Sequence, residues 1–401
     1  MRLLKSVCRW LAFALLALVL AGFLPAWLGA YGTLARRYAD TFTTNPLDPA
    51  YSWYDSLELV PGGGGPPLAQ ADPATSPFGP GVLEGAATYA AVHASDSLIV
   101  LYRGELAFER YWNGKGPDSP LGTHSLAKTL TAILIGHALA DGLIGSIDDP
   151  VFFHLAEWDD ETHRPITIRH LLNMASGLEE SYEFWPWSER VERAMGTDIE
   201  AANLRVPVAG PPGVSFRHIN PPPQLLAMVI ERATGRRYAE YLSEKFWQPI
   251  GARDAQLYVD HPGGTAHADC CMWTTIMDWA RVGEALRSRG LWQGRRVIPA
   301  GWPEQMVLAS PAYMNYGMML WLGNVHEPLR RYDPGQSGFE NRHSEPFAEG
   351  VFYLDGLGKQ RVWVVPGREL VIVRTGRDHP DWDEARIPNL LIRGMQVPPL
   401  F

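Results

Sequence analysis

The sequence contains little cysteine, with three residues in a chain of 401. Cys8 lies near the N-terminus, and Cys270 and Cys271 are neighbours, so no disulfide can close a long loop in the rest of the chain. A bond between the two neighbours would be strained, and we therefore expect no structural disulfide. The segment from His261 to Cys271 matches none of the usual C-x-x-C or H-x-x-x-H spacings, so we expect no metal site.

Positive charge is also scarce, since 35 lysines and arginines stand against 44 aspartates and glutamates and the net charge is −9. Phosphate binding needs clustered lysine and arginine, which the sequence lacks, and this argues against nucleic acid as a partner. The apolar content of 46% with 20% charged residues indicates a folded chain with a sizeable core, in one large or two intergrown domains.

The N-terminal segment differs from the rest of the chain. Arg2, Lys5 and Arg9 precede an uncharged stretch from Trp10 to Ala35, longer than the roughly 20 residues that cross a bilayer. We expect residues 1–35 to form a transmembrane anchor, with the body outside the cytoplasm, in the periplasm or at the cell surface, because positive flanks stay inside. A cleaved signal peptide, and hence a secreted body, is the alternative, although the apolar region is longer than usual.

The order of expected elements predicts the fold class. Residues 36–84 are rich in proline and glycine and read as a linker or surface arm. Strands are expected at both ends of the remaining chain, with a mostly helical stretch at about 125–290 between them. This order predicts an α+β domain over residues 85–398: an antiparallel sheet built from N- and C-terminal segments and flanked by helices, with an inserted all-helical domain. The expected strands are 97–102, 105–112, 348–354, 361–365 and 370–374, and a last helix is expected at 384–395.

Ser125 and Lys128 form an S-x-x-K tetrad at the start of a long apolar helix that Asp141 and Gly142 end. Residues three apart share a helix face, so the hydroxyl and the amine can meet. Serine is a poor nucleophile without a base, and lysine is a base only where its surroundings keep it neutral. The tetrad alone is common, and a capping serine with an exposed lysine is its ordinary structural meaning.

The motifs around the tetrad resemble those of a known family. The chain resembles the serine β-lactamase and penicillin-recognising superfamily, in its class C-like branch, and within that branch the 6-aminohexanoate-dimer hydrolase type. The similarity spans about residues 85–395. The segments that carry it are 125–132, 140–144, 148–151, 166–178, 224–226, 231–235, 248–251, 278–281 and 365–376.

The resemblance implies that Ser125 is acylated and that Lys128 is its general base. The family's second motif, Tyr-x-Asn, falls on His218-Ile219-Asn220, so a histidine replaces the tyrosine that shuttles a proton to the leaving group. An imidazole can do the same work because its pKa lies near the operating pH. The alternative is that His218 is only a pocket histidine in a weakened enzyme. Asn220 is expected to contact substrate or Lys128, or to be only a turn residue.

The third family motif, Lys/His-Thr/Ser-Gly on an edge strand, falls near residues 350–354, where no lysine or histidine stands. A backbone N–H can still bind the oxyanion together with that of Ser125, and Tyr353 or Leu354 is the candidate donor. Loss of the cation favours esters or amides over β-lactams. Tyr182 corresponds to a tyrosine that lines the pocket in the nylon-oligomer branch, although a surface or lid aromatic is an equal alternative.

The sequence therefore predicts a serine hydrolase that acts on a small ester, amide or peptide-like substrate without a cofactor. The partners expected are that substrate and, through the N-terminal segment, a membrane, and the sequence does not predict an oligomeric state. One alternative is a sensor or binding protein that keeps the fold and has lost turnover. Another is a D,D-peptidase or a β-lactamase.

Overall fold

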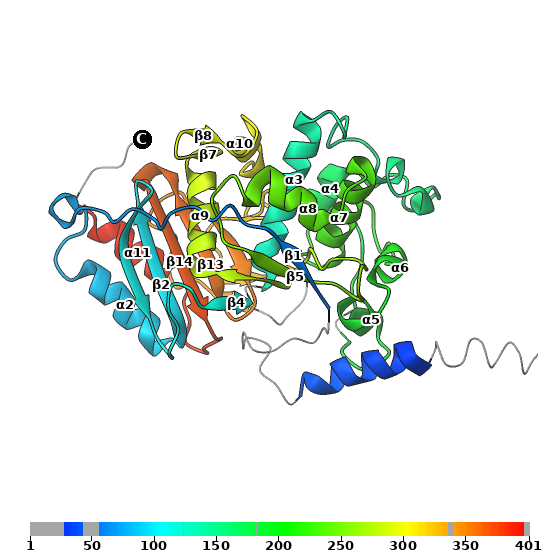
Figure 1. Cartoon of the computed structure of the whole chain (residues 1–401), viewed down its shortest axis with the longest axis horizontal. Coiled ribbons are helices and arrows are strands. Elements are labelled where there is room, and N and C mark those ends of the chain that lie inside the picture. Colours follow the sequence, from blue (N-terminus) through cyan, green and yellow to red (C-terminus); the bar gives the residue numbers. More distant parts are fainter. Residues whose placement is uncertain (1–27, 43–55, 123, 182, 336–339, 397–401) are drawn as a thin grey trace, which may run out of the picture.

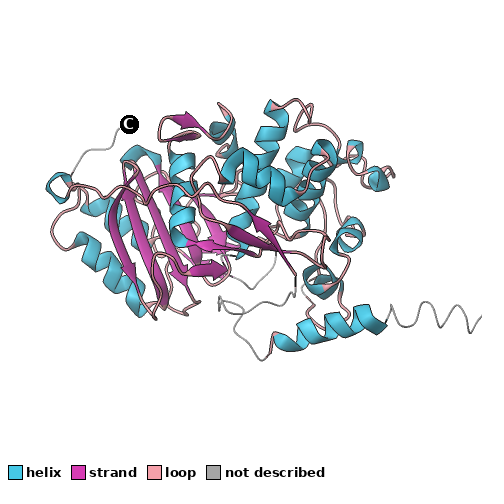
Figure 2. Cartoon of the chain, viewed as in Figure 1, coloured by secondary structure: helices cyan, strands magenta, loops and turns pink. Residues whose placement is uncertain are grey.

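The computed structural model describes residues 28–42, 56–122, 124–181, 183–335 and 340–396. A large antiparallel sheet with helices on its faces lies beside a mostly helical part (Figures 1 and 2). The predicted fold class is thereby confirmed.

The large sheet has the strand order β3-β2-β14-β13-β12-β9, and every neighbouring pair is antiparallel. Pairing of β2 with β14 joins the N-terminal and C-terminal halves of the sheet. The inner strands read as nearly continuous apolar runs because both of their faces are covered. The strands are β2 (Ser95–Tyr102), β3 (Glu105–Tyr111), β9 (Trp321–Leu322), β12 (Phe352–Gly356), β13 (Gln360–Val365) and β14 (Leu370–Gly376).

Helices cover the two faces of this sheet (Figure 1). On one side α2 (Val82–Val92) packs against β2 and against α11 (Arg386–Gly394). On the other, α9 (Ile276–Arg287) lies against β13 and β14. A Cβ at Gly283 would come within 2.6 Å of Val371 Cγ1 and 2.8 Å of Val362 Cγ1, so the absence of a side chain there lets α9 approach the sheet closely.

The helical part is built around α3 (Lys128–Ala140), which is almost wholly buried and packs against α7 (Pro221–Thr234). Three prolines open α7, which suits the first turn of a helix because its N–H groups have no intrahelical partner. The other elements are α4 (Ile168–Leu172), α5 (Glu189–Met195), α6 (Ile199–Leu204), α8 (Tyr238–Leu242), α10 (Trp302–Met306), a π-helical turn (Ser243–Trp247), the hairpins β7 (Leu291–Trp292) with β8 (Arg295–Arg296) and β10 (Leu329–Arg331) with β11 (Glu340–Arg342), and the 3₁₀ turns η1 (Pro73–Thr75), η2 (His124–Ala127), η3 (Val151–Phe153), η4 (Ala156–Trp158) and η6 (Pro366–Arg368).

A second, smaller sheet has the order β1-β5-β6-β4. It contains β1 (Leu57–Val60), β5 (Ala255–Tyr258), β6 (Met272–Thr275) and β4 (Pro120–Gly122), which comes just before the S-x-x-K tetrad. Strand β1 lies in the segment expected to be a linker or arm, and its pairing with β5 fixes that part of the segment to the body. The strand expected at 348–354 begins only at Phe352, and the Ala348 N–H donates to the Asn389 side-chain oxygen at 2.7 Å instead of to a neighbouring strand.

The structure corrects the prediction of a membrane anchor. Residues 28–35, the end of the expected span, belong to a helix at 28–40 that Arg37 fixes to the body. The buried Arg37 guanidinium donates to the main-chain oxygens of Met195, Gly196 and Asp260 at 2.8–3.0 Å. Among the described residues no helix has the length and apolar character to span a membrane, and residues 1–27 lie outside them. The membrane partner and the anchored, extracytoplasmic location are therefore not supported.

Candidate active site

Ser125 and Lys128 meet where η2 runs into α3. Lys128 is 1% exposed, whereas Ser125 keeps some exposure. Lys128 Nζ lies 2.8 Å from Ser125 Oγ, as the spacing of the tetrad predicts. The same nitrogen donates to Asn220 Oδ1 at 3.0 Å and to the main-chain oxygen of Asp269 at 2.6 Å.

Burial lowers the pKa of Lys128, while the nearby carboxylates of Asp269, Glu180 and Asp355 oppose that shift. A neutral amine has two N–H groups and one lone pair. If Asn220 and Asp269 take the two N–H groups, the lone pair is left for the Ser125 hydroxyl. The arrangement can therefore hold Lys128 as a base directed at Ser125 Oγ.

Asn220 is held in turn by Glu180, which is 8% exposed. The main-chain N–H and the Nδ2 of Asn220 donate to Glu180 Oε2 at 3.2 and 3.4 Å. These bonds turn the amide so that its oxygen faces Lys128. Arg193 Nε lies 3.9 Å from the other oxygen of Glu180 and partly balances its charge.

His218 is placed by its main chain, whose N–H donates to the oxygen of Tyr332 at 2.8 Å. Its ring packs among aromatic rings, with centroids 5.1 Å from Tyr332, 5.3 Å from Trp321 and 5.7 Å from Tyr316. Burial, together with the charge of Lys128, lowers the pKa of His218 well below its usual value, so the ring is neutral near pH 7. Within the described parts of the chain, no hydrogen bond joins the imidazole to Ser125 or Lys128.

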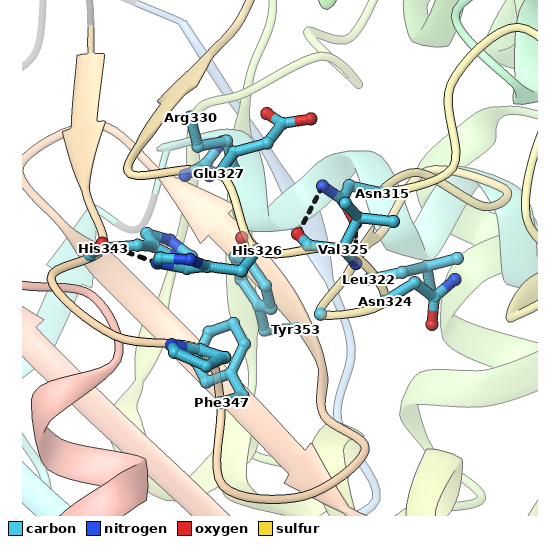
Figure 3. Close-up of a pocket in the computed structure, with 12 residues that line it drawn as sticks. Asn315, Leu322, Asn324, Val325, His326, Glu327, Arg330, His343, Phe347 and Tyr353 are labelled. Atoms are coloured by element: carbon cyan, nitrogen blue, oxygen red, sulfur yellow. Dashed lines mark hydrogen bonds between the residues drawn. The ribbon is translucent and has the colours of Figure 1, made fainter.

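Tyr353 and Leu354 lie on β12, which packs against the turn that carries Ser125. Strand β12 pairs with β9 as far as Tyr353, which lies opposite Trp321. Leu354 lies beyond the end of that pairing and is paired with Val362 of β13 on its other side. The Tyr353 side chain lines a separate cavity (Figure 3). Tyr182, the expected pocket aromatic, lies outside the described residues.

The sequence interpretation missed two groups that hold Lys128 and its partner. Asp269 acts through a main-chain oxygen, which has no sequence signature. Glu180 stands two positions before Tyr182, and its nearness to that candidate pocket residue is the one feature of the sequence that could have indicated it.

The cysteine pair also differs from expectation. The structure joins the sulfurs of Cys270 and Cys271 in a vicinal disulfide directly after Asp269. Ligand atoms of His267, Asp269 and Cys270 lie within 4.8 Å of one another. Because the Cys270 sulfur is bonded to Cys271, it is not available as a thiolate ligand in this state.

Comparison with known proteins gives the class of protein. Residues 86–392 match the Beta-lactamase family, so this chain belongs to the β-lactamase family, and the resemblance seen in the sequence is confirmed.

Individual relatives narrow the comparison. The chain is 26% identical over 225 residues to the 6-aminohexanoate-dimer hydrolase of Paenarthrobacter ureafaciens, covering 53% of this chain and 57% of that protein. It is 31% identical over 107 residues to the lovastatin esterase of Penicillium rubens, covering 25% and 26%. The chain thus spans less than two thirds of these curated relatives. Among solved structures, a putative 6-aminohexanoate-dimer hydrolase from Bacillus anthracis superposes with a TM-score of 0.68 over 85% of this chain and 90% of that one, at 20% identity.

Proposed function

We propose that this chain is a serine hydrolase that cleaves small ester or amide substrates through an acyl-enzyme on Ser125. The observation that carries the proposal is the 2.8 Å contact between Ser125 Oγ and the buried Lys128 Nζ. Relatives named 6-aminohexanoate-dimer hydrolase and lovastatin esterase support a hydrolase of this kind.

In the proposed mechanism the neutral Lys128 takes the hydroxyl proton as Ser125 Oγ attacks the substrate carbonyl carbon. The N–H groups of Ser125 and of Leu354, or of Tyr353, stabilise the oxyanion. The tetrahedral intermediate collapses when the bond to the leaving alcohol or amine breaks, and that group receives the proton that Lys128 took from Ser125, which leaves Lys128 neutral again. Water then attacks the acyl-enzyme and gives a proton to Lys128. Lys128 passes this proton to Ser125 Oγ as the acyl–oxygen bond breaks, which releases a carboxylic acid and free Ser125.

We assign to His218 the transfer of this proton from Lys128 to the leaving group, because its ring is neutral and lies close enough to Lys128 for the charge of Lys128 to shift its pKa. Burial keeps the pKa of His218 low, so a proton that reaches the imidazole leaves it readily. Asn220 is the residue that orients Lys128, as its amide oxygen accepts from Nζ. Tyr182 is retained as a candidate wall of the acyl pocket.

The test is pre-steady-state hydrolysis of a p-nitrophenyl ester. We expect a burst of nitrophenol equal to the enzyme concentration, followed by steady turnover, and neither with Ser125→Ala. Ser119→Ala, which removes a hydroxyl that accepts from the Gly116 N–H and makes no contact with Lys128, is the matched control and should keep both phases. Unchanged hydrolysis by Ser125→Ala would show that the nucleophile is another residue.

A sensor that acylates without turnover is the second candidate, because the His218 ring makes no hydrogen bond to the pair. A stoichiometric burst without steady turnover would favour it. Preferential turnover of a D-Ala-D-Ala peptide or a β-lactam over the ester and an amide would instead favour a D,D-peptidase or a β-lactamase.

A further inference from the structure

A disulfide between neighbouring residues lies next to the candidate base. The sulfurs of Cys270 and Cys271 are bonded, and Cys270 directly follows Asp269 in the chain. The main-chain oxygen of Asp269 accepts from Lys128 Nζ at 2.6 Å, which is shorter than the contacts of that amine with Ser125 and Asn220. The peptide group that supplies this acceptor therefore ends at a disulfide-bonded residue.

The main chain is anchored on both sides of this short segment. Before it, the Ala268 N–H donates to the buried Gln224 side chain at 3.0 Å. At its end, the Cys271 oxygen accepts from the Tyr258 N–H at 3.2 Å, and β6 follows at once. A change at the disulfide is therefore confined to the peptide groups that flank Cys270, and the first of these carries the acceptor for the candidate base.

The disulfide also holds an unusual backbone conformation. Cys271 has a φ of +70°, in the left-handed region that residues with a Cβ adopt rarely. The bond between adjacent residues closes a small ring that contains their shared peptide group, and this ring restricts the main chain there. When the ring opens, Cys271 can return to a negative φ, and the Asp269–Cys270 peptide group turns with it.

Cys270 is the accessible half of the pair. It keeps some exposure, whereas Cys271 is 7% exposed and packs with Tyr258 and Trp273. Thiol–disulfide exchange begins when a thiolate attacks one sulfur of the disulfide, so access decides which sulfur is attacked. A thiolate from solution therefore reaches the Cys270 sulfur first.

We propose that Cys270 and Cys271 form a thiol–disulfide exchange site that controls the proposed hydrolase: the closed pair holds the Asp269 carbonyl on Lys128, and a dithiol reductant that opens the pair lowers turnover. One thiolate of the reductant attacks the Cys270 sulfur, and the Cys271 sulfur leaves and takes a proton. The second thiol of the reductant loses its proton and displaces the Cys270 sulfur, which takes a proton, and the reductant becomes a disulfide. The inference rests on the proposed function, in which Lys128 is the base.

Opening the pair removes one of the two acceptors that orient the neutral amine of Lys128. Asn220 alone then holds the amine, and its lone pair points at Ser125 for less of the time. The loss of one such hydrogen bond corresponds to a roughly five- to tenfold lower kcat. KM should change by less than about twofold, because the lost contact is with the base and not with the substrate.

The test uses the full chain with Cys8→Ser, so that the pair accounts for both remaining cysteines. The protein is oxidised with oxidised glutathione or reduced with dithiothreitol, and gel filtration without oxygen then removes the reagent. Intact mass and a thiol count establish the state of the pair, and kcat and KM are measured with a p-nitrophenyl ester. EDTA is present throughout, because a reduced Cys270 would add a thiolate to the nearby ligand atoms of His267 and Asp269.

We expect no free thiol and full turnover in the oxidised chain, two free thiols and the lower kcat in the reduced chain, and recovery of kcat on reoxidation. Cys270→Ala combined with Cys271→Ala is the matched control. It should unfold cooperatively on heating, have the kcat of the reduced chain and not respond to the reductant. An unchanged kcat in the reduced chain, an equal effect of the reductant on the double variant, or two free thiols after oxidation would overturn the proposal.

Failure of the proposed function gives a different result. Ser125→Ala in the same background should abolish turnover in both states of the pair. Unchanged turnover by Ser125→Ala would overturn the proposed function, whereas turnover that needs Ser125 and ignores reduction would overturn only the role of the pair.

Discussion

Replacing Glu180 with glutamine tests whether the charge environment of Lys128 sets the pH dependence of the proposed hydrolase. The Glu180 carboxylate is separated from Lys128 Nζ by the Asn220 amide alone. Its negative charge favours the protonated amine and so raises the pKa of Lys128 against the effect of burial. Without that charge, the amine is neutral over a wider pH range.

The size of the effect follows from the geometry. Two unit charges about 7 Å apart interact by about 2 kcal/mol at an effective dielectric constant of about 20. Arg193 offsets part of the Glu180 charge, so about 1–1.5 kcal/mol should be lost with Glu180→Gln. Because 1.36 kcal/mol corresponds to one pH unit, the acid limb of kcat/KM for an ester should move down by about one pH unit.

The assay is the pH profile of kcat/KM for wild type, Glu180→Gln and Glu179→Gln. Glu179 is the adjacent carboxylate and pairs with Arg217 at 3.3 Å, away from Asn220, so Glu179→Gln should keep the wild-type acid limb. A lower plateau for Glu180→Gln would reflect a less firmly oriented amide and does not decide the matter. An acid limb that stays in place or moves to higher pH would refute the assignment of that limb to Lys128.

Substitutions at His218 and at Glu384 test the proposed proton transfer and the stability of the buried ion cluster. His218→Tyr should retain ester hydrolysis and His218→Ala should lose about 10²-fold in kcat/KM, as expected for a group that transfers a proton; equal rates for His218→Ala and wild type would exclude that role. Glu384→Gln should lower the free energy of unfolding by about 3–5 kcal/mol in urea denaturation, because it breaks a buried ion cluster. Glu84→Gln, in an exposed pair with Arg110, should change it by less than about 1 kcal/mol, and equal losses would contradict the burial argument.

Local spacing in the sequence is enough to predict the contact between Ser125 and Lys128. Ser125 and Lys128 are three positions apart, and the helical turn alone brings them together. Asn220 lies 92 positions from Lys128, so spacing cannot indicate it, and only its place in a family motif predicts its contact with Lys128. Asp269 lies 141 positions away and contributes only a carbonyl oxygen, so neither spacing nor residue type could indicate it.

Hydropathy misled the interpretation of the N-terminal segment for a related reason. The apolar stretch ends at Ala35, but the helix observed at 28–40 continues through Arg36 and Arg37. A window of hydropathy does not record that Arg37 finds three main-chain acceptors on the body. The contact is tertiary, and only the folded chain reveals it.

A buried ion cluster next to β12 affects which substrates the candidate active site can attract. The family strand motif lacks its cation here, and two arginines, Arg330 and Arg361, lie close to that strand instead. Both are paired with Asp355 and Glu384, so two positive charges meet two negative ones. No uncompensated positive charge in this cluster is then left to attract the carboxylate of a β-lactam to Ser125, and the acyl donor we expect there is a neutral ester or amide.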